Sequence, residues 1–360
     1  MTASPRPDVR KDAAAVRLRT LPLNSRAMVA ISSDVDGATL ETFRELHRFL
    51  NTTEPGPMGV GLGLDIADSM WVFTENVRPP TPVRMALVAG FGTNVLQPHA
   101  DEMARYARAG WIDTLHTWGN YSRAARTGVA FERSHAQQAL TLLNGLGIRL
   151  PVWVNHGNKQ NRQNIGPEAW MEGDRPGSAA YHSDLLPGLG IRYLCFEHRA
   201  PVTSTVPFEA RGLNDGGRIW SFTRSACVAV DRPDWIARRY GVTAAPNGSI
   251  WAWHPQTLHL QISDANLDAM IENSAAVVIA QHLGFHSPLR RLNRATLDAL
   301  ANLASRARTG DILVARTSRL LDFVVARTHL QFGAVDRGDR VIVDVAGVDC
   351  PLRGMLPPTP

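Results

Sequence analysis

Short apolar runs of strand length alternate with helix-period segments along most of this 360-residue chain. Such alternation is typical of a parallel sheet with helices on its outside, which makes the predicted fold class α/β. Seven or eight such units favour closure into a single (β/α)7-8 barrel over an open sheet. The predicted strands are Met28–Ser32, Met70–Thr74, Trp111–Leu115, Pro151–Val154, Ile191–Phe196, Ile219–Thr223, Ala275–Ala280 and Asp311–Ala315.

The segments between these runs carry apolar residues at helical spacing, and Ser134 is a favourable N-cap residue for one of them. Residues 200–262 are rich in Pro and Gly and read as irregular. We divide the chain into a flexible N-terminal arm (1–26), the barrel (27–330) and a C-terminal β extension and tail (331–360). The predicted helices are Thr39–Leu50, Pro98–Ala109, Ser134–Leu143, Tyr181–Leu189, Asp264–Glu272, Asn293–Arg308 and one from Ser318.

Composition excludes several classes of partner. The net charge of +5 is modest, and the basic residues are spread along the chain instead of forming the stripe that nucleic-acid binding needs. No run of 18 apolar residues predicts a membrane helix, and the N-terminus lacks the apolar stretch of a secretory signal. Cys195, Cys227 and Cys350 are too few and too widely spaced for a disulfide framework. We expect a cytoplasmic protein that acts on a small molecule or carbohydrate and has no membrane or nucleic-acid partner. The sequence does not indicate its oligomeric state.

Polar side chains collect where the predicted strands end. In a barrel the carboxyl ends of all strands meet on one face, which is where the catalytic groups of such folds lie. Five strand ends with carboxylate, imidazole or amide groups therefore predict one active centre. These residues are Asp34 and Asp36, His116 and Asn120, Asn155 and His156, Glu197 and His198, and His282.

The pair Asp34 and Asp36 is the most informative of these. Residues two apart on a strand point the same way, and two close carboxylates repel each other unless a cation neutralises them. A divalent metal would do so, and imidazoles are its natural further ligands. The alternative is that Ser33-Asp34-Val35-Asp36-Gly37 is only a turn that leads into the next helix.

The histidines each leave alternatives open. His116 and Asn120 have a spacing that suits two ligands on one turn, although His116 could merely cap its loop. His156 could bind metal, bind substrate or hydrogen-bond its own loop, and His282 could be catalytic or a satisfied buried residue. Three tryptophans near strand ends could stack on a sugar face or belong to the core, namely Trp71, Trp118 and Trp153.

The order of these motifs resembles the polysaccharide deacetylase family, the barrel fold of the chitooligosaccharide deacetylases. The resemblance covers residues 27–330 and rests on the following segments: Ser33-Asp34-Val35-Asp36-Gly37, His116-Thr117-Trp118-Gly119-Asn120, Asn155-His156-Gly157 and Ile279-Ala280-Gln281-His282. The deacetylase-like proteins of O-antigen biosynthesis are the subgroup it suggests. Here Val35 separates the two aspartates, Asn120 stands in place of the family's second histidine, and Asn155-His156-Gly157 replaces its Arg-Pro-Pro loop.

The resemblance implies a metal-dependent hydrolase that removes an acetyl or other acyl group from the nitrogen of a small amino sugar or related compound. Asp36 and His116 would bind a divalent metal, expected to be zinc, with Asn120 or His156 completing the set. The metal would activate water, Asp34 would act as general base and His282 would protonate the leaving amine. Four residues are predicted to bind substrate: Asn155, Trp153, His198 and Glu197.

Two further hypotheses remain open. Paired carboxylates without metal could hydrolyse another C–N bond or a glycosidic bond, with Asp34 or Asp36 working with Glu197 or Asp68. The barrel could also bind a glycan without catalysis.

Overall fold

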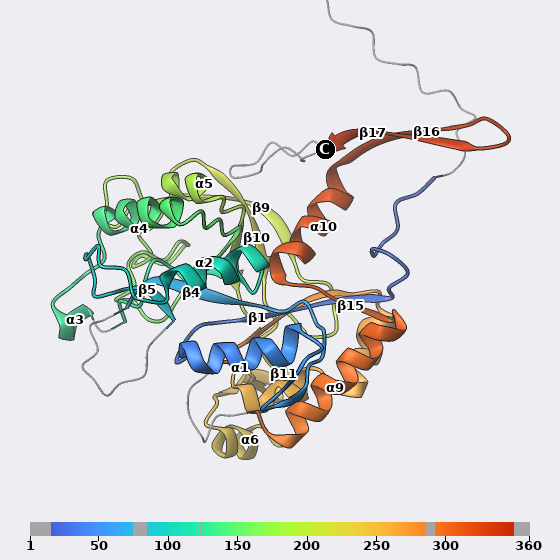
Figure 1. Ribbon diagram of the computed structural model, residues 1–360, viewed down its shortest axis with the longest axis horizontal. Helices are drawn as coiled ribbons and strands as arrows, with labels where there is room; N and C mark the ends of the chain where they lie inside the picture. The colour runs from blue at the N-terminus through green and yellow to red at the C-terminus, as the bar shows by residue number, and fades with distance from the viewer. Residues whose placement is uncertain (1–15, 75–84, 123, 285–291, 349–360) are drawn as a thin grey trace, which may run out of the picture.

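A curled, mainly parallel sheet forms the centre of the computed structural model, which describes residues 16–74, 85–122, 124–284 and 292–348 (Figure 1). Within the described residues this sheet has ten strands. Neighbouring strands are parallel, except that β9 and β10 are antiparallel. Two strands lie off the main path, β15 (Ile312–Val314) beside β1 and β5 (Ala86–Ala89) beside β4. The main order is β14 (Ala276–Gln281), β1 (Ala27–Ser33), β4 (Ala67–Thr74), β6 (Ile112–Leu115), β7 (Val152–Val154), β8 (Tyr193–Glu197), β10 (Arg218–Thr223) and β9 (Phe208–Gly212).

The two sides of the curled sheet meet at Ser225, just after β10. The Ser225 amide donates to Val278 O at 2.7 Å, and the Ala280 amide donates to Ser225 O at 3.2 Å. This single bridge joins the segment after β10 to β14, whereas the continuous strand pairing ends at β9. The prediction of an α/β fold with a parallel sheet is confirmed, while closure into a complete (β/α)7-8 barrel stays a prediction.

Helices flank the sheet, and most begin where the sequence predicts. Thr39, Ser263 and Asn293 each accept a hydrogen bond from a backbone amide in the first turn of the helix that follows. The prediction of Ser134 as an N-cap is wrong, because Glu132 holds that position and its amide donates to His135 Nδ1. The helices are α1 (Leu40–Asn51), α2 (Ala100–Ala109), α3 (Ala124–Thr127), α4 (Arg133–Gly145), α5 (Leu186–Leu189), α6 (Pro233–Tyr240), α7 (Leu258–Gln261), α8 (Asp264–Glu272), α9 (Arg294–Thr309) and α10 (Thr317–His329).

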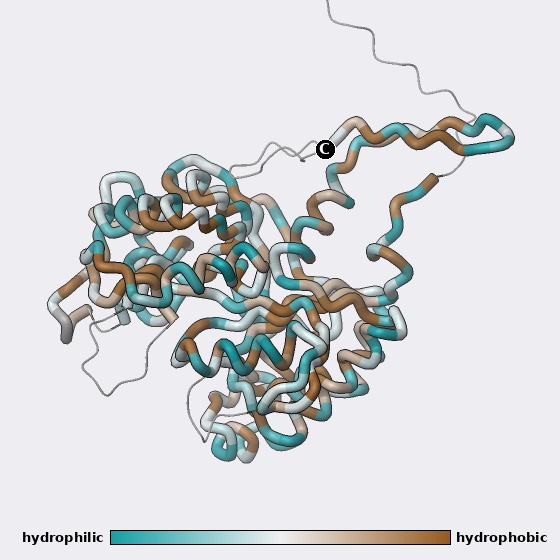
Figure 2. Tube along the Cα trace, viewed as in Figure 1, coloured by the Kyte–Doolittle hydropathy of each residue, from teal (hydrophilic) through white to brown (hydrophobic). Residues whose placement is uncertain are grey.

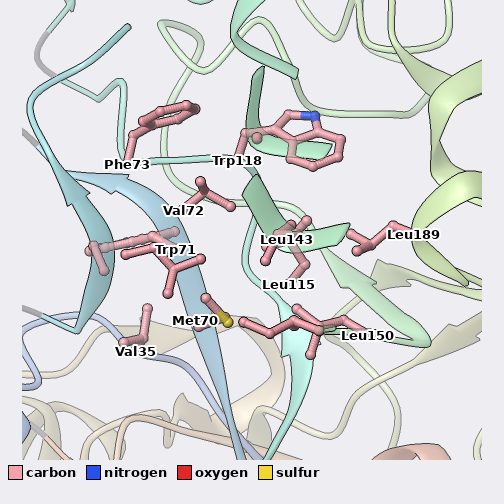
Figure 3. Close-up of a cluster of buried hydrophobic side chains, with 14 of the residues drawn as sticks. Val35, Met70, Trp71, Val72, Phe73, Leu115, Trp118, Leu143, Leu150 and Leu189 are labelled. Carbon is pink, nitrogen blue, oxygen red and sulfur yellow. The ribbon is translucent and has the colours of Figure 1, made fainter. Parts of the chain in front are cut away.

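The central strands are buried on both faces, as in parallel sheets covered by helices. Every residue of β1 and of β4 is buried, which explains why both read as nearly continuous apolar runs. Figure 3 shows part of this core, where Met70, Trp71 and Phe73 of β4 lie near Trp118 and Leu143. Burial of this kind holds the strand ends, and the polar residues on them, in fixed positions.

The segment 200–262, predicted to be irregular, contains regular structure. Its first part forms the β9–β10 hairpin, and its second part forms a separate small sheet of β11 (Cys227–Ala229), β13 (Ser249–Trp251) and β12 (Ala244–Ala245) with helix α6 beside it. A further small hairpin pairs β2 (Pro55–Gly56) with β3 (Gly59–Val60). Short strands rich in Gly and Pro have weak periodicity, so the sequence pattern did not reveal them.

The described part of the chain ends in a hairpin that projects from the end of α10, away from the sheet (Figure 1). Its strands are β16 (Leu330–Asp336) and β17 (Val341–Val348). Figure 2 shows apolar residues along both strands. The outer parts of the predicted N-terminal arm and C-terminal tail, residues 1–15 and 349–360, lie outside the described residues. No helix in the described ranges has the length and apolarity to cross a membrane.

Candidate active site and metal centre

Four strand ends bring one carboxylate and three imidazoles together. Asp36 follows β1, His116 follows β6, His156 follows β7 and His282 follows β14. The sequence predicted this convergence from strand order alone, because parallel strands place their carboxyl ends on one face. Asp34, at the end of β1, lies on the same side as Asp36, and the His116 ring stands between the two, with Nδ1 at 3.9 Å from Asp34 Oδ1 and Nε2 at 2.9 Å from Asp36 Oδ2.

Asp36, His116 and His156 form a candidate metal centre, since one ligand atom from each lies within 4.8 Å of the others. His156 Nδ1 is 2.9 Å from His116 Nε2 and 3.5 Å from Asp36 Oδ1. Tetrahedral zinc with ligands at about 2.0–2.2 Å holds its ligand atoms about 3.3–3.6 Å apart. The donor types and their spacing therefore fit a divalent cation with two nitrogen ligands and one oxygen ligand.

The pKa values of these groups reflect burial set against close opposite charges. Burial raises the pKa of Asp36, but His156 and His116 more than offset this effect and hold it well below its usual range. Burial dominates at His156 and lowers its pKa to about 4, despite the nearby carboxylates. Asp36 is thus ionised and His156 neutral at pH 7, which are the protonation states that metal binding requires.

His282 differs from the other two imidazoles. Its Nδ1 lies 3.2 Å from the Trp253 carbonyl oxygen, to which it donates, and its Nε2 lies 3.5 Å from Asp36 Oδ2. Burial lowers the pKa of His282, yet Asp36 and Asp34 reverse this and raise it above the ordinary value of 6.5. A histidine with both ring nitrogens facing acceptors favours the protonated form, so His282 can serve as a proton donor.

Asp34 is held by a buried, bidentate ion pair with Arg224. The guanidinium donates from Nη1 to Oδ1 at 2.7 Å and from Nη2 to Oδ2 at 2.8 Å, and Nη1 also donates to Ser32 Oγ. Burial would raise the pKa of Asp34, but Arg224 and His116 lower it far below its ordinary value of 3.8. Asp34 is therefore ionised at every physiological pH and fixed in orientation.

The remaining donor of Arg224 fixes His198. Arg224 Nε donates to His198 Nδ1 at 3.2 Å, and because a guanidinium cannot accept, Nδ1 must carry no proton. Burial and the positive charge of Arg224 together lower the pKa of His198 to about 3. His198 is consequently neutral, with its proton on Nε2.

Several predicted substrate-binding residues have other roles. Trp153 is fully buried and packs against Trp118 and His182, and its predicted role in substrate binding stays a prediction. Asn155 uses its side chain to hold the following loop, as its Oδ1 accepts from the Trp153 indole and the Ile165 amide. Glu197 is exposed, and its described ion pair is a 3.5 Å contact with Arg199 outside the cluster.

Asn120 is not brought into the metal cluster by any contact among the described residues. Its Oδ1 accepts from the Ser122 amide at 3.0 Å and shapes the turn after His116. Asp68, the alternative catalytic carboxylate, is buried 3.2 Å from His47 and is likewise separate from the cluster. Of the three tryptophans, Trp71 lies beside the cluster, where its ring stacks on His116 at 5.9 Å and meets His156 edge-on at 5.2 Å.

Arg224 is the residue that the sequence analysis missed. It directly follows the predicted strand Ile219–Thr223, so the strand-end rule applied to the other strands would have found it. It was overlooked because its strand lies in the segment that read as irregular.

Comparisons with known proteins add little to this chemistry. No protein-family model matches the chain, and no curated protein does. Among solved structures the chain is similar to a protein from Mycobacterium smegmatis provisionally assigned as a polysaccharide deacetylase, with 14% identity, a TM-score of 0.40 and coverage of 88% of this chain and 96% of that one. It is also similar to Puue allantoinase, with 13% identity, a TM-score of 0.36 and coverage of 90% and 98%. At such TM-scores neither likeness supports an inference about activity.

The candidate metal centre predicts selective loss of metal binding. His116→Ala and His156→Ala should each lower zinc affinity at least 10-fold, because each removes one of three protein ligands. Isothermal titration with zinc at neutral pH measures this, with Asn120→Ala as a control that should bind like the parent chain. Equal affinity in all three variants would contradict the assignment.

The Asp34–Arg224 pair predicts a pH-dependent loss of stability in Arg224→Met. The paired Asp34 has a lowered pKa, so it stabilises the fold above pH 3.8 and loses that contribution only as the pH falls through its folded-state value. Without Arg224, burial raises the pKa of Asp34, and the variant becomes less stable as the pH rises above 3.8. At pH 7 we expect a loss of about 3–5 kcal/mol in unfolding free energy.

Urea denaturation at pH 5 and pH 8 tests this sign. The double variant Asp34→Asn, Arg224→Met is the control, because it leaves no unpaired buried charge and should recover part of the loss at both pH values. A deficit in Arg224→Met that is independent of pH would show that the charge of Asp34 is not its cause.

Proposed function

We propose that this protein is a metal-dependent hydrolase that removes an acyl group, most simply acetyl, from the nitrogen of a small amino sugar or related substrate. The observation that carries the proposal is the composition of the cluster. A two-histidine, one-carboxylate metal centre lies between an anchored carboxylate, Asp34, and an imidazole that favours its protonated form, His282. These three elements together suit the hydrolysis of an amide.

Asp36, His116 and His156 would hold the cation. When bound, a divalent cation would supply Lewis-acid polarisation of the acyl carbonyl and make water a stronger acid. The second ring nitrogen of His116, Nδ1, is buried without a hydrogen bond and faces Asp34. A carboxylate on the far side of a ligating imidazole is the usual arrangement for orienting that ring.

Asp34 and His282 would move the protons. Water adds to the acyl carbon and gives its proton to Asp34, which Arg224 keeps ionised and in one orientation. The C–N bond then breaks as the nitrogen takes a proton from His282, releasing an amine and a carboxylic acid. Asp36 and the Trp253 carbonyl hold His282 on its two nitrogens, so its ring orientation does not change between these events.

His198 would bind a substrate oxygen. Its Nε2 proton is fixed by the Arg224 contact and its low pKa prevents a second proton, so it is a neutral donor over the working pH range. A neutral donor can bind a hydroxyl or carbonyl without attracting the carboxylate product. This keeps the substrate-binding role predicted for His198 from the sequence.

The part of the substrate remote from the acyl group has a candidate pocket beside the site. A pocket of about 370 Å³ lies over one face of the β11–β13–β12 sheet and is lined by Arg199, Cys227, Asn247 and Trp251 among others. Trp251 is two residues from Trp253, whose ring meets His282 at 5.0 Å. The Trp251 ring stacks on no aromatic or guanidinium group in the described ranges, which suits contact with a sugar face.

The alternatives have less support. A metal-free glycosidase would need Asp34 or Asp36 close to a second free carboxylate, whereas Asp68 is paired with His47 and Glu197 lies outside the cluster. A glycan-binding barrel without catalysis would not need a protonated histidine and an anchored carboxylate on either side of a metal centre.

Acetate release from a panel of N-acetylated amino sugars tests the proposal. Asp34→Asn and His282→Ala should each lower kcat/KM at least about 100-fold, because each removes one proton transfer. Glu197→Gln, an exposed change outside the cluster, is the matched control and should keep activity. We also expect kcat/KM to fall as the pH rises through the pKa of His282, since the proton donor is then lost.

Chelation provides the second part of this test. Removal of metal should abolish activity and zinc should restore it. Full activity in protein that contains no metal by elemental analysis would contradict the proposal, as would unchanged turnover in Asp34→Asn.

A further inference from the structure

His156 presents its two ring nitrogens to different surroundings. Nδ1 lies in the candidate metal centre, 2.9 Å from His116 Nε2 and 3.5 Å from Asp36 Oδ1. Nε2 lies 3.3 Å from the hydroxyl oxygen of Ser122, which belongs to the turn that follows His116. These contacts make Nδ1 the ligand atom and leave Nε2 to a partner outside the centre.

The position of the His156 proton decides whether this residue can bind a cation. A ring nitrogen that ligates a metal carries no proton, so a neutral imidazole that binds through Nδ1 keeps its proton on Nε2. Ligating histidines nearly always donate this second N–H to a fixed acceptor, which orients the ring and selects the tautomer. For His156 the acceptor within the described ranges is Ser122 Oγ.

A buried amide holds the Ser122 hydroxyl in place. Asn161 is fully buried, and its Oδ1 accepts from the Tyr121 amide at 2.9 Å, which fixes the other end of the side chain as the donor. Its Nδ2 donates to Ser122 Oγ at 2.9 Å. A hydroxyl oxygen has two lone pairs, so one accepts from Asn161 and the second remains for His156.

Gly157, directly after His156, makes room for this arrangement. Its φ is 67°, in the left-handed region, and a Cβ at this position would lie 2.5 Å from Ser122 Oγ and 2.7 Å from Asn161 Nδ2. The backbone of His156 is also fixed, because the Asn164 side chain accepts from its amide at 3.1 Å and donates to its carbonyl oxygen at 3.0 Å. The imidazole and the hydroxyl are therefore both held by groups outside the metal centre.

We propose that Ser122 is a positioning residue of the metal centre, whose hydroxyl accepts the Nε2 proton of His156 and leaves Nδ1 free to bind the cation. The inference rests on the proposed function, because it needs the centre formed by Asp36, His116 and His156. The second ring nitrogen of His116 instead faces a carboxylate, Asp34, at 3.9 Å. A hydroxyl orients His156 without adding negative charge beside the cation, which leaves the cation a stronger Lewis acid.

Isothermal titration of the full chain with zinc tests the role of Ser122. Ser122→Ala should bind zinc at least about 10-fold more weakly than the parent chain, because the Nε2 proton loses its acceptor. Ser25→Ala is the matched control, since it removes a half-buried hydroxyl near the start of β1, at the other end of that strand from Asp34, and should bind zinc like the parent. Urea denaturation of the metal-free variants checks that both are folded.

Gly157→Ala is an independent variant that keeps the hydroxyl. The added Cβ would displace Ser122 Oγ, so the affinity for zinc should again fall. In the Ser122→Ala background the same change should cost much less, since substitutions that act through one contact are not additive. Fully additive losses would contradict a shared route through Ser122.

Nitrogen-15 NMR of the zinc-loaded chain with labelled histidines reads the tautomer directly. The His156 signals, assigned by their absence in His156→Gln, should show the proton on Nε2, and this proton should exchange with solvent faster in Ser122→Ala. A His156 proton on Nδ1, or a zinc affinity of Ser122→Ala equal to that of the parent, would overturn this proposal while the metal centre itself stands. A parent chain that does not bind zinc would overturn the proposed function, and this inference with it.

Discussion

The buried pair between Arg224 and Asp34 is the interaction on which the rest of the site depends. A charged group removed from water is costly unless it is paired and hydrogen-bonded, and here every donor edge of the guanidinium has a partner in Ser32, Asp34 or His198. The pair connects the end of β1 with the segment after β10, elements 190 residues apart in the chain. It thereby fixes at once the anchored carboxylate and the tautomer of His198.

The backbone around the pair supports the same connection. Ser225, the residue after Arg224, bridges to β14 through two backbone hydrogen bonds, so the guanidinium crosses the interior where the curled sheet meets itself. Strands β1 and β14 are adjacent and parallel, and their last residues, Ser33 and Gln281, lie opposite each other. Asp34 and His282 therefore extend from neighbouring strand ends, and the backbone bridge at Ser225 places Arg224 against the first of them.

Strand order explains both what the sequence could predict and where prediction failed. Asp36, His116, His156 and His282 could be assigned to one site because each follows a clear apolar run, and parallel strands end on one face. Arg224 follows an equally good run but lay in a segment dominated by Pro and Gly. The burial of Trp153 could not be predicted for a different reason: its side chain points to the opposite face from Val152 and Val154, and what covers that face depends on helices distant in sequence. The choice between Asn120 and His156 needed the loop hydrogen bonds that engage Asn120 with Ser122.

Charge balance in the cluster links metal binding to proton donation. Arg224 neutralises Asp34, which leaves Asp36 as the carboxylate shared by His116, His156 and His282. A proton on His282 balances this charge at 3.5 Å from Asp36 Oδ2, whereas the candidate ligand His156 contacts Oδ1. A cation held by Asp36, His116 and His156 would compete with that proton for the same carboxylate. The proton on His282 would then be held less tightly, and it would be given more readily to a leaving amine. Asp36, which would bind the metal, thus also sets the acidity of His282, the proton donor that would complete the hydrolysis.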